Sequence, residues 1–361
     1  VTMGTKVFWD FGDGQTSEQL NPTHVYLRPG LYAVKLSVHR GAKPLEVASR
    51  VQVRRPLIPD DGKRKPDQLA DYLDMLDDYD PRKLDGPSLV QIVRVFDQAD
   101  QTAEAVRVGK VAFQSNAAFY DDDSLHTLAR LLGPMIRDRQ NDPAATLQLW
   151  QVASRLVQRD VWKAECEVEA ADICLTDVLQ PGSAKSLLES AQARLKAADD
   201  PVLARRLHRL WGDWFAFEGD AAAARAAYSH SAALLVSRRN AVEHNAWRGA
   251  FSRSTEAFLR DGQLDSARHE LRRWETDFPG DKIEGYLPLL QARLWLAAGK
   301  HAQAIAVANN LITVNAASPY ADQLVYLAAE CEQKLGHTEQ ARAHYESLVA
   351  HYPGSPLVES S

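Results

Sequence analysis

The sequence predicts a chain of two parts, a small antiparallel β module followed by an all-α solenoid of stacked helical hairpins. Apolar residues alternate with polar ones between turn signals over residues 1–55, which is the pattern of half-buried strands. A Gly-x4-Ala pair then recurs through the second half of the chain, as in helical repeat proteins. Between the two patterns, residues 56–66 are dense in proline and charge, which predicts a linker.

The β module is predicted from three segments. Residues 7–14 run from a strand into an Asp13-Gly14 turn, which is a strong hairpin signal. Residues 32–38 follow a Pro-Gly turn and place Tyr32 and three aliphatic residues on one face. Apolar and polar residues alternate again over residues 47–53. The sequence therefore predicts a small antiparallel sheet with one buried face.

Three ordered motifs in this module resemble the polycystic-kidney-disease (PKD) domain, an immunoglobulin-like β-sandwich. They are Trp9-Asp10-Phe11-Gly12-Asp13-Gly14, Pro22-x-His24-x-Tyr26 and Gly30-x-Tyr32-x-Val34-x-Leu36-x-Val38. Family members have about two further strands before the tryptophan, so the resemblance implies an incomplete sandwich over residues 1–55 with an unpaired edge. It also implies an extracytoplasmic protein (periplasm, cell envelope or secreted), because these domains mostly serve as surface spacers or adhesion modules.

Two pairs of residues in the motifs have two interpretations each. Asp10 and Asp13 could bind calcium, a cation that prefers oxygen ligands. We expect them instead to orient the turn through bonds to its backbone. Trp9 and Tyr32 could form a platform for a sugar, but aromatic residues on the inner face of a sheet are expected to be core.

The helical part is predicted from a repeat of about forty residues. Glycine suits the left-handed turn between two helices, and alanine five residues later lets the helices approach closely. The alanines of four successive Gly-x4-Ala pairs are separated by 43, 37 and 37 residues. Looser copies lie upstream at Ala105, Ala145 and Ala184. The four pairs are Gly219/Ala224, Gly262/Ala267, Gly299/Ala304 and Gly336/Ala341.

This order of residues resembles the tetratricopeptide repeat (TPR). Gly212, Phe215, Gly219, Ala224 and Tyr228 fit one copy, and the later copies keep the glycine and alanine with aromatic or leucine positions around them. The resemblance implies an all-α TPR-like superhelical solenoid over residues 67–361, with the strongest repeats in 201–356. It also implies a partner protein bound in a groove formed by the first helix of each hairpin.

Carrying the groove positions of the family onto this chain gives eleven candidate binding residues, rich in the arginine and tyrosine that dominate interfaces. This mixture of basic, acidic and aromatic residues differs from the Lys/Asn clamp of TPR proteins that bind chaperones. A chaperone is therefore not inferred as the ligand of this chain. The candidates are Arg206, Arg209, Asp213, Glu256, Arg260, Tyr286, Leu289, Arg293, Tyr326, Glu330 and Lys334.

No catalytic, metal or cofactor site is expected. The sequence contains no nucleophile elbow, P-loop, dinucleotide-binding glycine motif or His-Glu-x-x-His. Cys166 and Cys174 would lie roughly 12 Å apart on one helix, too far for a disulfide, so buried free thiols are expected there and at Cys331. The net charge of -6 disfavours nucleic acid, and no apolar run is long enough to span a membrane.

The sequence therefore predicts a non-enzymatic extracytoplasmic scaffold that binds other proteins. Two alternatives stay open. In the first, the β module binds carbohydrate, such as a cell-surface glycan, and the solenoid is a stalk. In the second, the chain is an accessory part of a larger secreted enzyme, since PKD domains often accompany hydrolases.

Overall fold

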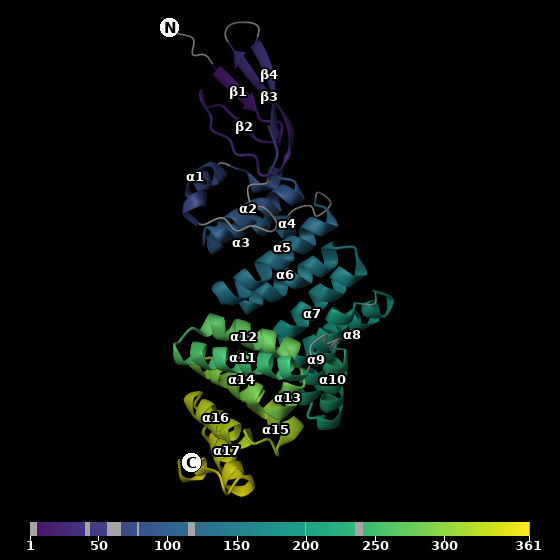
Figure 1. Cartoon of the computed structure of the whole chain (residues 1–361), viewed down its shortest axis with the longest axis vertical. Helices are drawn as coiled ribbons and strands as arrows, with labels where there is room; N and C mark the ends of the chain where they lie inside the picture. Colours follow the sequence, from purple (N-terminus) through teal and green to yellow (C-terminus); the bar gives the residue numbers. More distant parts are fainter. Residues whose placement is uncertain are drawn as a thin grey trace. The chain divides into compact units, whose positions relative to one another are not determined.

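The computed structural model of this chain forms two compact units, residues Val1–Arg159 and Asp160–Ser361 (Figure 1). The predicted linker, residues 56–66, lies almost wholly outside the described residues, since the first helix begins at Pro66. The predicted boundaries at residues 55 and 67 thus stay a prediction. The structure describes residues 6–39, 44–55, 66–77, 79–114, 120–198, 200–234 and 241–360.

The first unit begins with a four-stranded antiparallel sheet in the order β2-β1-β3-β4. Its strands are β1 (Lys6–Asp10), β2 (Thr16–Ser17), β3 (Gly30–His39) and β4 (Pro44–Val53). Trp9 lies opposite Leu36, and Leu36 lies opposite Val47. The predicted hairpin after Asp10 and the predicted alternation along β3 are both confirmed.

The aspartates of the turn bond to its backbone, as expected. The Gly12 N–H donates to Asp10 Oδ1 at 2.9 Å, and the Gln15 N–H donates to Asp13 Oδ1 at 3.1 Å. Gly12 has a φ of +79°, and a Cβ there would lie 2.7 Å from the Ala33 carbonyl oxygen. Glycine is therefore required at this position both for its conformation and for space.

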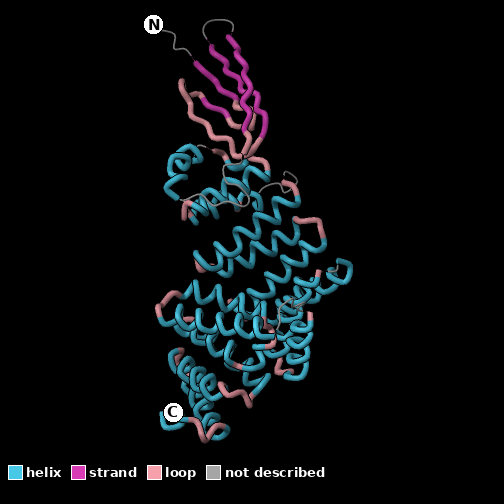
Figure 2. The backbone as a smooth tube through the Cα atoms, viewed as in Figure 1, coloured by secondary structure: helices cyan, strands magenta, loops and turns pink. Residues whose placement is uncertain are grey.

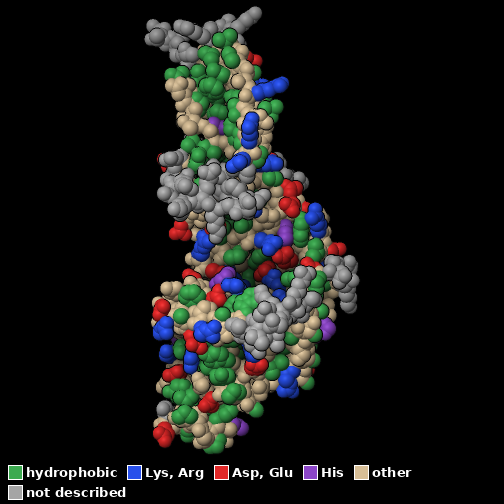
Figure 3. Space-filling model, viewed as in Figure 1, with side chains coloured by type: hydrophobic (Ala, Val, Ile, Leu, Met, Phe, Trp, Pro, Cys, Tyr) green, Lys and Arg blue, Asp and Glu red, His purple; other side chains and the backbone are tan. Residues whose placement is uncertain are grey.

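The apolar face of the sheet is only partly covered: the alternating pattern predicted one buried face, but part of the face around Trp9 and Tyr32 is exposed, as expected for an incomplete sandwich. Trp9 and Tyr32 are half-buried. On β4, which shares that face, Leu45, Val47 and Val51 are 65%, 54% and 38% exposed. Hydrophobic side chains are visible over the strands in Figure 3. Within the described residues one sheet is formed and no second sheet packs on this face, so β4 presents aliphatic residues to solvent.

Helices follow the sheet within the first unit. Tyr79, after α1, stacks its ring on His24 at 5.5 Å, and His24 stacks on Phe11 at 3.9 Å. The Tyr79 hydroxyl donates to the Val25 carbonyl oxygen, which joins the sheet to the helices. The helices are α1 (Pro66–Asp77), η1 (Pro81–Lys83), α2 (Gly86–Gln98), α3 (Thr102–Gly109), α4 (Val111–Gln114), α5 (Asp122–Pro134), the π-helix η3 (Met135–Arg139) and α6 (Pro143–Leu156).

The described part of the second unit contains only helices (Figure 2). Helices that follow one another in the chain pack as antiparallel hairpins, notably α9 with α10 and α16 with α17. They are α7 (Asp160–Thr176), α8 (Pro181–Ala198), α9 (Pro201–Phe217), α10 (Ala221–Ala233), α11 (Ala241–Arg260), α12 (Leu264–Asp277), α13 (Asp281–Glu284), α14 (Tyr286–Ala297), α15 (His301–Asn315), α16 (Ala321–Lys334), α17 (Thr338–His351) and η4 (Pro356–Ser360).

The repeat chemistry of the four strong copies is confirmed. The turn glycines have φ values from +70° to +81°, the left-handed conformation that was predicted. The alanines five residues later are at most 3% exposed. A Cβ on Gly212 would lie 2.5 Å from the Tyr228 ring, so this glycine makes room for the aromatic residue of the next helix. The predicted free, buried cysteines are confirmed as well.

The predicted repeat position at Ala145 was wrong by one residue. Ala145 is half-buried, whereas the neighbouring Thr146 is fully buried and its hydroxyl donates to the Asp142 carbonyl oxygen at 2.7 Å. Asp142 caps α6, because its carboxylate accepts from the Ala145 N–H. The cap fixes where the helix begins, and this start turns residue 146 rather than 145 toward the core.

The solenoid also contains contacts between helices whose hairpins are not neighbours in the sequence. Helix α15 packs against α9 and α10, although three helices and a short turn of helix separate them in the sequence. The Arg225 guanidinium donates to the Val314 carbonyl oxygen at 2.9 Å. The predicted class, an incomplete sandwich followed by an all-α TPR-like solenoid, is confirmed. Among the described residues, no helix combines the length and the apolarity needed to cross a bilayer.

Candidate functional site

The structure separates the predicted groove residues into an interior group and an exposed group. Arg209, Asp213 and Leu289 are buried, at 4%, 5% and 1% exposure. Arg206 is half-buried and forms an ion pair with Glu169 at 2.6 Å. The remaining seven candidates lie on the surface or half-buried on α11, α14 and α16.

Arg209 and Asp213 belong to a buried ion cluster, which also contains Asp172, Glu275 and Lys282. The Arg209 guanidinium donates to Asp172, Asp213 and Glu275 at 2.9, 3.3 and 2.8 Å. The Lys282 ammonium reaches Asp213 at 2.9 Å and Glu275 at 3.2 Å. These side chains come from α7, α9, α12 and α13, so the cluster ties together four helices of the second unit.

Hydrogen bonds and neighbouring charges stabilise the ionised form of Glu275 in the cluster. Tyr228 donates to Asp213 at 2.7 Å, and Gln291 donates to Glu275 at 2.7 Å. Burial alone would raise the pKa of Glu275, but Arg209 and Lys282 outweigh it and hold that pKa below its usual value. Arg209 and Asp213 therefore act as structural groups inside the helical unit, with their charges bound to internal partners.

The seven candidates that are exposed or half-buried form a set that we call the open row. Its helices are neighbours, because α14 packs against both α11 and α16. The same helices also carry buried residues such as Phe251, Leu290 and Leu324. The open row comprises Glu256, Arg260, Tyr286, Arg293, Tyr326, Glu330 and Lys334.

Several members of the open row are brought together in space. The Tyr286 hydroxyl donates to the Glu256 carboxylate, which links α14 to α11. Burial, followed by the contact with Glu256, raises the pKa of Tyr286 to about 12. Arg293 donates to Gln323 Oε1 at 3.1 Å, which links α14 to α16. The ring of Tyr326 lies 5.9 Å from that of Tyr345 on α17.

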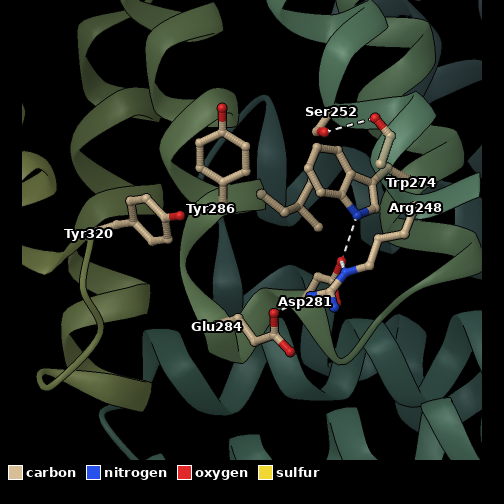
Figure 4. Close-up of a pocket in the computed structure, with 9 residues that line it drawn as sticks. Arg248, Ser252, Trp274, Asp281, Glu284, Tyr286 and Tyr320 are labelled. Atoms are coloured by element: carbon tan, nitrogen blue, oxygen red, sulfur yellow. Dashed lines mark hydrogen bonds and ion pairs between the residues drawn. The ribbon is translucent and has the colours of Figure 1, made fainter. Parts of the chain in front are cut away.

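A cavity of about 410 Å³ lies beside Tyr286 (Figure 4). Trp274 Nε1–H donates to Asp281 Oδ2 at 2.7 Å. Arg248 Nε donates to the same oxygen at 2.6 Å, and its second nitrogen pairs with Glu284. The lining residues are Arg248, Gly249, Ser252, Trp274, Asp281, Glu284, Tyr286, Leu287 and Tyr320.

The backbone between α13 and α14 positions the charged side of this cavity. Gly285 has a φ of +107°, and a Cβ there would overlap the Ser318 hydroxyl. That hydroxyl donates to the Glu284 carbonyl oxygen at 2.7 Å. The short helix therefore ends in a fixed turn that places Glu284 and Tyr286 on the same cavity.

Of the cavity residues, the sequence pointed only to Tyr286. Arg248, Trp274, Asp281 and Tyr320 lie in four different segments, and their grouping depends on how the hairpins stack. The Pro279-Gly280 break before Asp281 was visible in the sequence, but nothing marked it as part of a site. No cluster of three or more His, Cys, Asp or Glu side chains suited to a metal ion occurs in the described ranges.

Two family models match the chain. The PKD domain model matches residues 3–53, and the tetratricopeptide repeat model matches residues 323–355. The resemblances drawn from the sequence motifs are thus confirmed for these segments. Among curated proteins, collagenase ColQ1 of Bacillus cereus (strain Q1) is 63% identical over 30 residues, which is 8% of this chain. The matched stretch spans 3% of the length of that collagenase.

Among solved structures, similar chains include a tetratricopeptide repeat protein from Parabacteroides merdae, with 15% identity and a TM-score of 0.35 over 76% of this chain and 96% of that one. A Rap protein complexed with competence and sporulation factor has 17% identity and a TM-score of 0.37, covering 81% of each chain. Aspartyl phosphate phosphatase F from Bacillus subtilis has 13% identity and a TM-score of 0.37, covering 74% of this chain and 70% of that one.

Proposed function

We propose that this chain is a non-enzymatic scaffold that binds a protein partner through the open row on α11, α14 and α16. One observation carries the proposal: the open row combines tyrosine, arginine and carboxylate side chains that the helical core does not bury. Exposed tyrosine and arginine on a rigid surface are the residues that most often dominate protein interfaces. The TPR match at residues 323–355 supports the same class of function.

We propose further that the protein acts outside the cytoplasm, in the periplasm, in the cell envelope or as a secreted protein. The PKD match at residues 3–53 supports this location. Fractionation of the source cells, with an antibody against the chain and markers for each compartment, tests it. Recovery of the protein with the cytoplasmic marker would overturn this part of the proposal.

The binding proposal is tested with a matched pair of charge reversals in the full chain. Partners are captured on immobilised protein from an envelope extract, identified by mass spectrometry, and titrated by calorimetry. Arg293→Glu changes an exposed residue of the open row, and we expect roughly tenfold weaker binding, as for a moderate interface hot spot. Arg342→Glu makes the same charge change on α17, where Arg342 is 72% exposed and forms an ion pair with Glu346 at 2.8 Å.

Binding by the Arg342→Glu control should stay within about twofold of the parent chain, as expected for a charge outside the contact surface. The open row would be excluded if Arg293→Glu bound every captured partner as tightly as the parent, or if the two variants lost affinity equally.

A second candidate function is favoured by the 30-residue similarity to a collagenase. In this candidate, the chain is an accessory part of a larger secreted enzyme, and its β module helps to hold the enzyme on its substrate. Co-sedimentation of the full chain with insoluble collagen fibres tests it. An equal amount of protein left in the supernatant with and without fibres would remove this candidate.

A further inference from the structure

We infer that the cavity beside Tyr286 receives a basic side chain, lysine or arginine, of the partner protein. This inference rests on the proposed function, because the cavity shares Tyr286 with the open row. It adds a chemical class of ligand that the open row alone does not specify. The argument has three steps: the aromatic walls, the balance of charge and the state of Arg248.

Three aromatic side chains bound the cavity from different helices and loops. The rings of Tyr286 and Tyr320 are 5.0 Å apart at 36°, and the rings of Trp274 and Tyr286 are 6.2 Å apart at 65°. Trp274 is 2% exposed, whereas both tyrosines are half-exposed. In Figure 4, Trp274 and the two tyrosines lie around the space above Asp281 and Glu284. The faces of such rings attract cations.

The charges around the cavity also favour a cation. Among the residues that line the cavity, two carboxylates, Asp281 and Glu284, stand against one guanidinium, that of Arg248. Glu284 is 61% exposed, so its carboxylate can accept further hydrogen bonds. Burial raises the pKa of Asp281, although its bonds from Trp274 and Arg248 oppose that shift. Glu284 is therefore the carboxylate best placed to meet an incoming cation.

Arg248 does not make the cavity a site for anions. Its guanidinium is held between Asp281 and Glu284, which already supply its opposite charge. An anionic ligand would have to compete with both carboxylates. A cationic side chain instead joins an existing group of carboxylates, and its aliphatic stem can lie along the rings of Tyr286 and Tyr320. The volume of about 410 Å³ is within the range of small-ligand pockets.

The direct test uses single amino-acid probes and the full chain. The probes are Nα-acetylarginine amide, Nα-acetyllysine amide and, as the neutral isostere of arginine, Nα-acetylcitrulline amide. Binding is followed through the indole N–H resonance of Trp274 in protein labelled with ¹⁵N-tryptophan and assigned with Trp274→Phe. We expect saturable shifts with both basic probes, and roughly fivefold weaker binding of citrulline, because bonds to charged groups are stronger than neutral ones.

Two variants and one control locate the binding. Glu284→Gln removes the exposed carboxylate, and Tyr320→Leu removes one aromatic wall while staying apolar. Both should abolish the probe-dependent shift, whereas Glu339→Gln, an exposed carboxylate on α17, should leave it unchanged. Helical circular dichroism confirms that each variant is folded. Equal shifts with arginine and citrulline, or none with either basic probe, would overturn the inference.

The same variants distinguish a failure of this inference from a failure of the proposed function. If Arg293→Glu weakens a captured partner but Glu284→Gln and Tyr320→Leu do not, the open row stands and the basic-side-chain pocket is wrong. If the basic probes bind but no partner depends on Arg293, the pocket stands and the proposed groove is wrong.

Discussion

The two units of this chain bury polar groups in different ways. In the first unit, the sheet meets the helices through stacked rings, with Phe11, His24 and Tyr79 in contact and one carboxylate, Asp13, bonded to His24 at 2.8 Å. In the second unit, five charged side chains form the buried ion cluster.

The two sets of contacts also differ in how far apart their residues lie in the sequence. The ring stack is built largely from one short segment, residues 11–26, with Tyr79 added from the helices. The ion cluster joins residues 37, 66 and 69 positions apart, so it can form only after several hairpins have packed. Removing one member of the ion cluster leaves buried charge uncompensated, so we expect substitutions there to destabilise the chain more than substitutions in the ring stack.

The largest effect is expected from Arg209→Met. The change removes the guanidinium that bridges the three carboxylates of the cluster, and breaking a buried ion pair in this way typically costs about 3–5 kcal/mol. Urea unfolding of the full chain, followed by helical circular dichroism, measures it. Arg342→Met is the control, since this exposed arginine should matter by no more than about 0.5 kcal/mol. Equal unfolding midpoints for the two variants would contradict the structural role of the cluster.

A smaller effect in the same unit is expected from Gly212→Ala. The added Cβ would lie 2.5 Å from the Tyr228 ring, which is buried and bonded to Asp213 and so has little room to move. Overpacking of this kind costs about 1–3 kcal/mol. Gly182→Ala is the control: nothing lies within 4 Å of its Cβ, so the change should be neutral or slightly stabilising. If both variants melt like the parent, α9 and α10 are not packed as closely as described.

These contacts also show what the sequence could predict. The turn glycines, the small residues at helix crossings and the alternating strand of the β module are local patterns with a fixed spacing. They were read correctly because a left-handed turn or a close helix approach restricts the residue at that position whatever surrounds it. Ala145 was misassigned because the helix start depends on the cap at Asp142.

The candidate site was less predictable. Repeat position placed Arg209 and Asp213 in a groove, but α12 and α13 supply Glu275 and Lys282 to them, which encloses both side chains. Nothing in the repeat pattern specifies that closure. The aromatic cavity was missed for the same reason, since Arg248, Asp281 and Tyr320 meet only through the stacking of three hairpins.

In the first unit, Tyr79→Phe should have a moderate effect on the sheet. The change removes the hydroxyl that donates to the Val25 carbonyl oxygen, and an unsatisfied buried acceptor costs about 1–3 kcal/mol. Hydrogen exchange measured by mass spectrometry should show faster exchange in β1 and β3, with α14 and α16 unchanged. Tyr72→Phe, on α1, is the control and should leave exchange of the strands as it is. Unchanged protection in Tyr79→Phe would mean that this hydroxyl does not help to hold the sheet on the helices.

The smallest effect on stability is expected from the titration of His208. Its ring lies 4.2 Å from that of His230, with the two residues on α9 and α10. Burial, followed by the charge of His230, lowers the pKa of His208 below its usual value. The unfolded chain therefore binds a proton at a higher pH than the folded chain does, so stability is lost as the pH falls below the ordinary pKa of about 6.5. Because His208 is partly exposed, we expect no more than about 0.5 kcal/mol after solvent screening.

His208→Gln removes this titration. Between about pH 8 and pH 5.5, urea unfolding of the variant should lose slightly less stability than the parent, since one histidine no longer charges on unfolding. The internal control is the comparison at pH 8, where the imidazole is neutral in both states, so any difference there reflects packing alone. If the variant lost more stability than the parent as the pH falls, the expected direction would be wrong. The charged imidazole of His208 would then be favoured in the folded chain. In that case the second unit would hold cations at its helix contacts as well as in its ion cluster.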